Sequence, residues 1–297
     1  MPRWAMTALL LPALFAAPLP AWQAAVVVVS EPGVDAYAEA VEGVGAVLPA
    51  GSFRVVDATA RDFAGAIESK DTRVAIAVGS RALEEVRARH PALPLVTAMV
   101  LHAGGVHAAD VEPASQRVEL DIPLAAQLGA MRALWPGRRR AGMIRNPAQS
   151  PGPAEALEAC ARREGFVPVV VDCDGPAHLL KALAALQGKA DFVLCFPDPE
   201  LYNPVTVKPL VLASLEHGLP LVGFSPAFVR AGAAAGIFPD YRDMGRQAAE
   251  MALRLLRGEG RPADESPRKI HVAINQRVTR LLGVEFRAGA LVAEVFR

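Results

Sequence analysis

Short apolar runs alternate with amphipathic helical segments through most of the chain, and this alternation limits the fold more than any other feature. The runs at residues 24–30, 74–80 and 192–196 are rich in Val, Ala and Leu and lack polar alternation. Such runs are typical of strands that are covered on both faces of a sheet. A strand that is repeatedly followed by a helix predicts a parallel sheet with right-handed crossovers, so we expect an α/β fold with doubly wound parallel sheets.

The alternation runs through the chain twice, with a break near Leu120 to Pro123. A chain of 297 residues has the length of two domains. We therefore expect two successive α/β units. A late strand (269–275) and a short helix (276–282) are left over, which indicates a chain that crosses between the units more than once, as a hinged two-lobed binding protein requires.

Residues 1–23 have the layout of a secretory signal peptide. Arg3 supplies a basic start, residues 5–17 are apolar, and prolines break the end of the segment. The apolar run is too short to span a bilayer comfortably. We expect a periplasmic protein whose mature chain starts close to Ala24, with an uncleaved membrane anchor as the alternative.

The charge balance and the cysteines give no indication of several common kinds of binding site. Lys plus Arg (31) balance Asp plus Glu (31), so net charge gives no reason to expect binding to nucleic acid or to an anionic membrane surface. The three cysteines, Cys160, Cys173 and Cys195, form no C-x-x-C pair. We expect them to be buried free thiols and to form neither a disulfide nor a metal site.

Polar residues follow the apolar runs, at the sheet edge where ligands bind because helix N-termini gather there. An amino-acid-like ligand needs a carboxylate for its ammonium group and a ring for its side chain. Asp198 is the candidate for the first role and Tyr202 for the second. Capping a helix is the alternative role for Asp198, Asp240 and Ser80, and forming a turn is the alternative for Asn146. The candidate ligand-binding residues are Ser30, Ser80, Asn146, Asp198, Tyr202, Asn203, Ser225 and Asp240.

An enzyme is a further class of function to consider. Residues 223–227 (GFSPA) follow a predicted strand and come close to the nucleophile elbow of hydrolases, with His217 or His271 as conceivable bases. Ala227 replaces the second glycine of that motif, and no G-x-G-x-x-G fingerprint opens the first helix. We therefore expect no catalysis, no cofactor and no metal, and a serine hydrolase is a minor alternative.

Four segments together resemble a known family. They are LWPGRRRAGMIRNP (134–147), the strand and loop ending in Asp198, LPLVGFSPAFVRAGAAAGIFPDYRDMGRQAAEMALRLLRGEGRP (219–262) and VAINQRVTRLLGVEF (272–286). In this order they resemble the substrate-binding proteins of bacterial ABC importers, in the branch associated with tryptophan and tyrosine uptake. The resemblance covers residues 120–286 well and the first unit only loosely.

The resemblance implies the type I periplasmic-binding-protein fold, in which three crossovers join two lobes and ligand binds in the cleft between them. The crossovers are expected near Ile122, Pro239 and Arg268. The implied domains are a first lobe of residues 24–121 plus 240–260, a second lobe of 122–239 plus 268–286, and a C-terminal tail of 287–297.

The expected function is that of an exported monomer that captures a small organic solute, such as an aromatic or apolar amino acid, and delivers it to an ABC permease in the inner membrane. The alternative with the same fold is a periplasmic sensor that is read by a membrane receptor or kinase.

Overall fold

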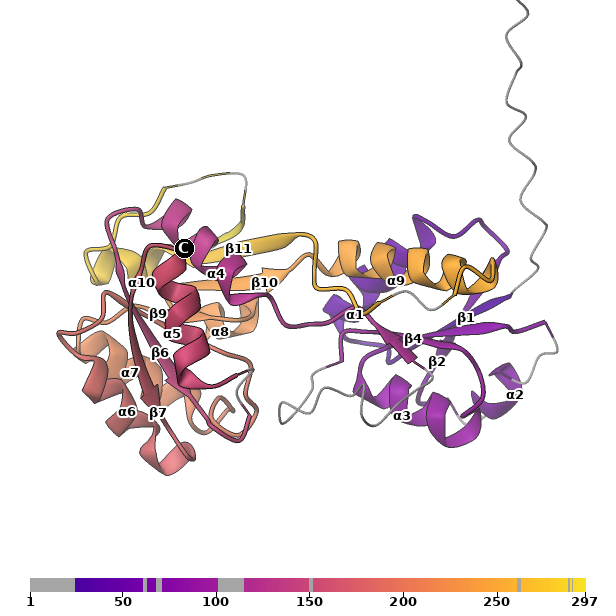
Figure 1. Ribbon diagram of the computed structural model, residues 1–297, viewed down its shortest axis with the longest axis horizontal. Helices are drawn as coiled ribbons and strands as arrows, with labels where there is room; N and C mark the ends of the chain where they lie inside the picture. Colours follow the sequence, from indigo (N-terminus) through magenta and orange to yellow (C-terminus); the bar gives the residue numbers. More distant parts are fainter. Residues whose placement is uncertain are drawn as a thin grey trace, which may run out of the picture.

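The computed structural model describes residues 25–60, 63–67, 71–100, 115–149, 152–260, 263–287, 289 and 291–297. These residues form two α/β lobes that lie side by side (Figure 1). Each lobe is built on a sheet of mainly parallel strands, so the predicted fold class is confirmed. The predicted signal peptide lies outside the described residues. None of the described helices is long and apolar enough to cross a bilayer.

The first lobe contains a five-stranded parallel sheet in the order β2-β1-β3-β4-β5. Its strands are β1 (Val26–Ser30), β2 (Phe53–Asp57), β3 (Val74–Val78), β4 (Leu95–Ala98) and β5 (Ser115–Arg117). All residues of β1, β3 and β4 are buried, as their unbroken apolar runs predict.

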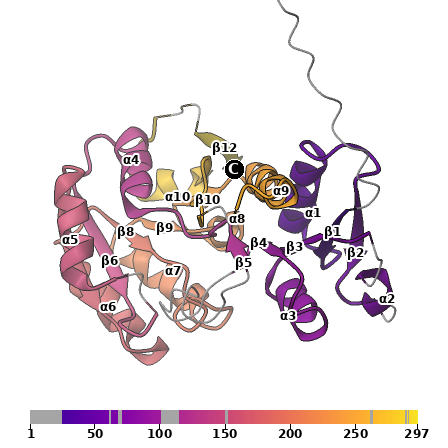
Figure 2. The same cartoon turned by 45° about the vertical axis from the view of Figure 1, so that its right-hand side comes forward.

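Helices cover both faces of this sheet. One face packs on α1 (Asp35–Gly45) and α9 (Tyr241–Leu256), and the other on α2 (Phe63–Ile67) and α3 (Ser80–Arg89). Helix α9 comes late in the chain, yet its apolar stripe, which includes Met244, Ala248 and Met251, joins the first-lobe core. Figures 1 and 2 both place α9 beside α1.

Helices α1 and α9 approach each other most closely at two glycines. A Cβ atom built on Gly245 would lie 1.9 Å from the carbonyl oxygen of Ala40, and one built on Gly43 would lie 1.9 Å from that of Arg242. Each helix therefore occupies the space that a side chain would need on the other. Such close backbone contact requires glycine at both positions.

The second lobe contains a seven-stranded sheet in the order β12-β11-β10-β9-β8-β6-β7, in which β10 and β11 are the antiparallel neighbours. Its strands are β6 (Arg140–Arg145), β7 (Val167–Asp172), β8 (Phe192–Cys195), β9 (Leu221–Gly223), β10 (Ala235–Pro239), β11 (Ile270–Asn275) and β12 (Val292–Phe296). The sequence does not predict β12, because it sets residues 287–297 apart as a tail.

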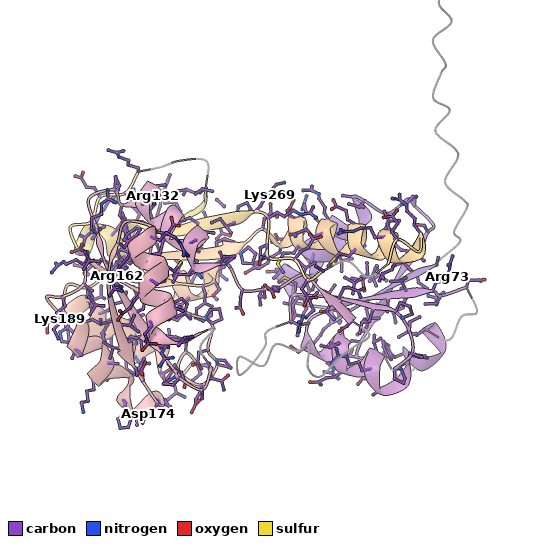
Figure 3. The ribbon with its side chains drawn as sticks, viewed as in Figure 1. Arg73, Arg132, Arg162, Asp174, Lys189 and Lys269 are labelled. Carbon is purple, nitrogen blue, oxygen red and sulfur yellow. The ribbon has the colours of Figure 1, made fainter. Side chains whose placement is uncertain are left out.

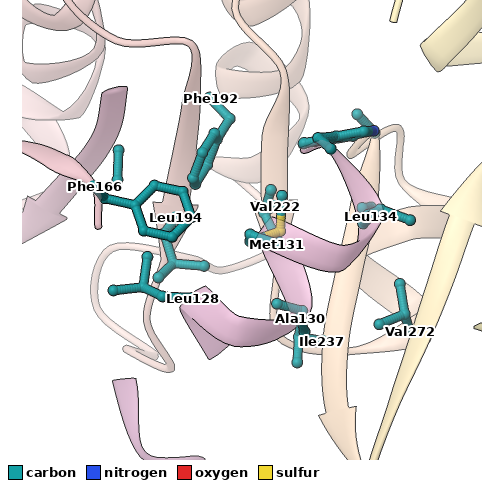
Figure 4. Close-up of a cluster of buried hydrophobic side chains, with 14 of the residues drawn as sticks. Leu128, Ala130, Met131, Leu134, Phe166, Phe192, Leu194, Val222, Ile237 and Val272 are labelled. Atoms are coloured by element: carbon teal, nitrogen blue, oxygen red, sulfur yellow. The ribbon is translucent and has the colours of Figure 1, made fainter. Parts of the chain in front are cut away.

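Two apolar layers enclose this sheet. Figure 4 shows part of the first layer, where Leu128 and Met131 of α4 (Leu124–Leu134) face Phe192 and Leu194. The remaining second-lobe helices are α5 (Ala154–Arg163), η2 (Pro176–His178), α6 (Leu179–Leu186), α7 (Val207–Glu216), α8 (Pro226–Arg230) and α10 (Gln276–Leu281). Helices α4, α5 and α10 contribute to the first layer, and α6, α7 and α8 to the second.

The chain passes between the two sheets after β5, between β10 and α9, and between α9 and β11. The last passage is fastened to the first lobe. Arg117 donates from its backbone N–H and its guanidinium to Asp264, at 2.6 to 3.0 Å. The carboxylate of Glu265 accepts hydrogen bonds from Gln247, Arg254 and Arg268.

Lys269 ends this fastened passage at the junction of the lobes (Figure 3), where its carbonyl oxygen accepts a hydrogen bond from Asp240 N at 3.0 Å. Its ammonium group lies 2.9 Å from Asp243 of α9. Residues 264–269 are therefore bonded to the first lobe, and the chain rejoins the second sheet at β11.

Candidate functional site

The carboxyl ends of β6 and β8 carry the polar side chains that the sequence singles out in the second lobe. Asn146 follows β6, and Asp198 follows β8 by three residues. The two strands are parallel neighbours, so the loops that follow them leave the same sheet edge side by side. Figure 1 places these loops on the side of the second lobe that faces the first lobe.

A small polar cavity lies between these two loops. Its lining includes Asn146, Gln149, Asp198 and Tyr202, and its volume is about 10 Å³. That volume is close to the minimum that holds one water molecule. Three oxygen atoms of the lining residues are buried: Oε1 of Gln149 and Oδ2 of Asp198 have no hydrogen-bond partner, and the hydroxyl of Tyr202 lies beside the Cys195 thiol.

The Asp198 side chain has two different oxygens. Oδ1 accepts hydrogen bonds from the backbone N–H groups of Glu200 and Leu201, at 2.8 and 3.0 Å, and so closes the turn that follows β8. Oδ2 has no partner, although the residue is only 5% exposed. The neighbouring guanidinium of Arg145 does not neutralise it, because Arg145 bonds both carboxylate oxygens of Asp172.

Asn146 supports the cavity wall, and each polar atom of its side chain already makes one hydrogen bond within the protein. Its Nδ2 donates to Oε2 of Glu200 at 3.1 Å, and its Oδ1 accepts from Ala148 N at 3.1 Å. The residue is buried. The first bond ties the loop after β6 to the loop after β8, and the second forms the turn that sequence analysis gives as the alternative role.

Tyr202 is buried with its ring inside the core of the lobe. The ring packs edge-on against Phe224 and Phe228, with centroid distances of 5.9 and 5.7 Å. Burial is the main cause of the raised pKa of the Tyr202 hydroxyl, and the nearby Cys195 thiol and Asp198 carboxylate add to it. The ring thus packs within the core of the lobe, and the role of Tyr202 as the ring that contacts a ligand side chain stays a prediction.

The structure gives two further predicted residues, Asn203 and Ser225, local roles. The amide of Asn203 closes the turn before α7 by accepting from Val205 N and Thr206 N. Ser225 caps α8, because its hydroxyl accepts from Phe228 N at 3.2 Å. No hydrogen bond recorded among the described residues joins that hydroxyl to a histidine, so the hydrolase alternative gains no support.

Asp240 caps α9 by accepting from Asp243 N at 2.9 Å, which is the alternative role that the sequence suggests. Its second carboxylate oxygen lies 3.6 Å from Nε2 of His271 on β11. Asp240 therefore joins the start of a first-lobe helix to a second-lobe strand. It is not one of the residues that line the polar cavity.

The predicted first-lobe residues lie at the carboxyl ends of β1 and β3. Ser30 is the last residue of β1 and is buried, whereas Ser80 is exposed and is the first residue of α3. Gly79 before it has φ of 93°, and the Tyr37 ring fills the space where a Cβ would stand, since that atom would lie 2.6 Å from Cζ of Tyr37. Burial, together with the charge of Glu31, raises the pKa of Tyr37.

The structure thus brings Asn146, Asp198 and Tyr202 together around one cavity. Sequence reasoning missed Gln149, which stands three residues after Asn146 in the turn after β6. Its position just beyond a strand end is the signal by which it could have been found.

Comparison with known families and structures places this geometry in context. The family described as ABC transporter substrate binding protein matches residues 58–293. A search among curated proteins finds no match.

Three solved structures have similar folds. One is the ligand-free, open structure of a substrate-binding protein with adhesive properties from Clostridium difficile, with 15% identity, coverage of 91% of this chain and 98% of that chain, and a TM-score of 0.68. The ABC domain in complex with L-Trp from Streptococcus pneumonia has 16% identity, coverage of 91% and 100%, and a TM-score of 0.57. A periplasmic ribose ABC transporter from Conexibacter woesei has 13% identity, coverage of 87% and 94%, and a TM-score of 0.50. At these identities the likeness supports the type I periplasmic-binding-protein fold.

Proposed function

The chain belongs to the family of ABC transporter substrate-binding proteins, and we propose that it binds a small organic solute with a primary amino group between its two lobes. The mechanism is differential affinity. A closed arrangement of the lobes contacts the solute on both sides, whereas an open one contacts it on a single side, so the solute stabilises closure. No chemical step is required of the protein.

Three buried oxygens of the residues that line the second-lobe cavity carry this proposal. The Oδ2 of Asp198 and the Oε1 of Gln149 can only accept hydrogen bonds, and the Tyr202 hydroxyl can accept one as well. Leaving a buried carboxylate oxygen without a partner is costly. A primary ammonium group offers three N–H donors and one positive charge. It therefore matches the number of acceptors and the charge of the cavity.

The size of the cavity limits how much of the solute it can hold. A volume of about 10 Å³ admits a group the size of a water molecule, so the ammonium group alone would enter it. The remainder of the solute would extend from the second lobe toward the first. There the free N–H groups at the start of α3, next to Ser80, suit a carboxylate. This division of contacts supports an amino acid as the solute class.

The proposed setting is the periplasm. Residues 1–23 would direct export and be removed, and the monomeric mature protein would present its solute to an ABC permease in the inner membrane. The family description and the signal-like layout of the first residues support this setting. A purified ATPase and permease pair in vesicles would import solute only in the presence of this protein.

Replacing Asp198 with Asn tests the site. The substitution keeps an oxygen for the turn formed with Glu200 N and Leu201 N, but places a donor where Oδ2 now faces the cavity. A hydrogen bond to a charged group contributes about 1.5 to 3 kcal/mol, so affinity for an amino acid should fall roughly tenfold to a hundredfold. Isothermal titration calorimetry with tryptophan, tyrosine and leucine measures the affinity of wild type and variant.

Two controls make the experiment specific. Asp174, at the lower end of the second lobe in Figure 3, is exposed and pairs with His178, so Asp174→Asn should bind as wild type does. N-acetylated amino acids keep the side chain and lose the ammonium group, and they should bind far more weakly than the free amino acids. Equal affinity for the acetylated and free forms would show that the cavity does not hold an amino group.

A further inference from the structure

A second hollow lies at the outer end of the second lobe. It has a volume of about 860 Å³ and is lined by Gln276, Arg277, Arg280 and Leu281 of α10 and by Arg297, which follows β12. All three arginines and Leu281 are exposed, and Leu281 is 70% exposed. The hollow therefore presents three guanidinium groups and one aliphatic side chain to solvent.

Strand direction places this hollow far from the solute cavity. Strand β11 runs antiparallel to β10, and Ile274 near its end pairs with Ala235, the first residue of β10. Helix α10 therefore starts at the amino-terminal edge of the parallel strands, whereas the solute cavity lies beyond the carboxyl ends of β6 and β8. In Figure 1, α10 lies on the side of the second lobe away from the first lobe.

The three guanidinium groups of the hollow form no ion pair within the described part of the protein. Several other second-lobe arginines have acidic partners, as Arg140 does in Asp191 and Arg162 in Glu158. No ion pair or hydrogen bond to the guanidinium groups of Arg277, Arg280 and Arg297 is found among the described residues.

The arginines of the hollow also stand close together. Arg277 and Arg280 are three positions apart on one helix, a spacing that places side chains on the same face. Arg297 reaches the same hollow from the neighbouring strand. Like charges held around one hollow repel each other, and a bound anion would relieve that repulsion.

We propose that this hollow binds the phosphate group of an organic phosphate, and that Leu281 contacts the apolar part of the same molecule. A guanidinium group pairs with phosphate through two parallel N–H···O bonds. Several phosphate oxygens and up to two negative charges can satisfy more than one arginine at once, which a single carboxylate cannot do equally well. A free phosphate ester and a phospholipid headgroup share this chemistry, and the experiment separates them.

The first arm of the experiment uses a free phosphate ester. Glycerol 3-phosphate is titrated into the full chain by calorimetry, with glycerol as the uncharged control and sodium chloride at equal ionic strength. The test variant is Arg277→Gln/Arg280→Gln. The control variant is Arg162→Gln/Arg163→Gln, which removes the same charge from α5, on a different face of the lobe (Figure 3). Each charge-assisted contact that is lost should weaken binding roughly tenfold or more.

The second arm uses vesicles of phosphatidylcholine with or without phosphatidylglycerol. The difference in binding between the two compositions is compared for wild type and both variants, which share the same first residues. The site is supported if the α10 variant loses phosphate binding in either arm and the α5 variant keeps it. The arm in which this happens shows whether the ligand is a free phosphate ester or a phospholipid headgroup. If wild type binds in neither arm, or if the α10 variant binds as wild type does, the proposal is wrong. Asp198→Asn should leave phosphate binding unchanged. The proposal of a phosphate site can therefore succeed or fail independently of the proposed solute site.

Discussion

Replacing Gly245 with Ala should destabilise the first lobe, although alanine favours a helix more than glycine does. The new Cβ would lie 1.9 Å from the carbonyl oxygen of Ala40 and 2.7 Å from its carbonyl carbon. Both are backbone atoms of α1 and cannot rotate away. A Cβ needs at least about 3 Å from such an atom, so the two helices would have to part by roughly 1 Å.

The expected magnitude is the difference between two effects. Forcing extra volume into a packed core costs about 1 to 3 kcal/mol, and here the upper end applies because both sides of the clash are backbone. Replacing glycine with alanine in a helix interior stabilises the helix by about 1 kcal/mol. The net loss in the free energy of unfolding should therefore be about 2 kcal/mol. Parting the helices would also loosen Met244 and Ala248, which are fully buried beside them.

The matched control is Gly129→Ala in the middle of α4, where a new Cβ would meet no heavy atom within 4 Å. This variant should gain about 0.5 to 1 kcal/mol, because it keeps the propensity effect and has no clash. Urea denaturation followed by circular dichroism measures both variants. If Gly245→Ala is as stable as Gly129→Ala, the close crossing of α1 and α9 is wrong, and the packing argument with it.

Three further predictions address redox state, pH and processing. Cys160, Cys173 and Cys195 form no disulfide in the structure, so a thiol assay on the denatured, unreduced protein should count all three; a count of one would contradict the strand order. Burial alone would raise the pKa of Glu265, but hydrogen bonds from two arginines and a glutamine lower it below the usual 4.5. Its contribution to stability is then present above pH 4.5 and is lost as pH falls through the lowered pKa. Glu265→Gln should accordingly be less stable than wild type at pH 7, and this difference should shrink as the pH falls below 4.5; a difference that stays constant as the protein is acidified would refute this. Mass spectrometry of the exported protein should find a chain that starts close to Ala24, and only full-length protein in the cytoplasm would exclude export.

Much of the fold follows from the sequence because its strands are buried on both faces. The runs that form β1, β3 and β8 are apolar throughout, so they could be recognised without any knowledge of their neighbours. Strand β12 was missed for the opposite reason. It lies at the edge of its sheet, only partly buried, and its five residues VAEVF do not stand out from a tail.

The candidate site was accessible to sequence reasoning only in part. Strand ends indicated Asn146 and Asp198, because the position of a residue along a parallel sheet can be read from the alternation. The direction of a side chain cannot be read in this way. The ring of Tyr202 packs in the core, and the side-chain oxygen of Asn203 accepts hydrogen bonds from the local backbone. Whether the cavity residues bind a ligand stays a prediction.

The late position of α9 in the chain has a consequence for folding during synthesis. The first sheet ends with β5 at Arg117, but α9, which covers one of its faces, begins only at Tyr241. More than a hundred residues are made in between, and at about 5 to 20 residues per second this takes on the order of 10 s. During that time the buried faces of β3 and β4 that await Met244 and Ala248 have no cover from α9. The nascent first lobe therefore exposes an apolar sheet face, to which chaperones or other unfolded chains can bind, until nearly the whole chain has been made.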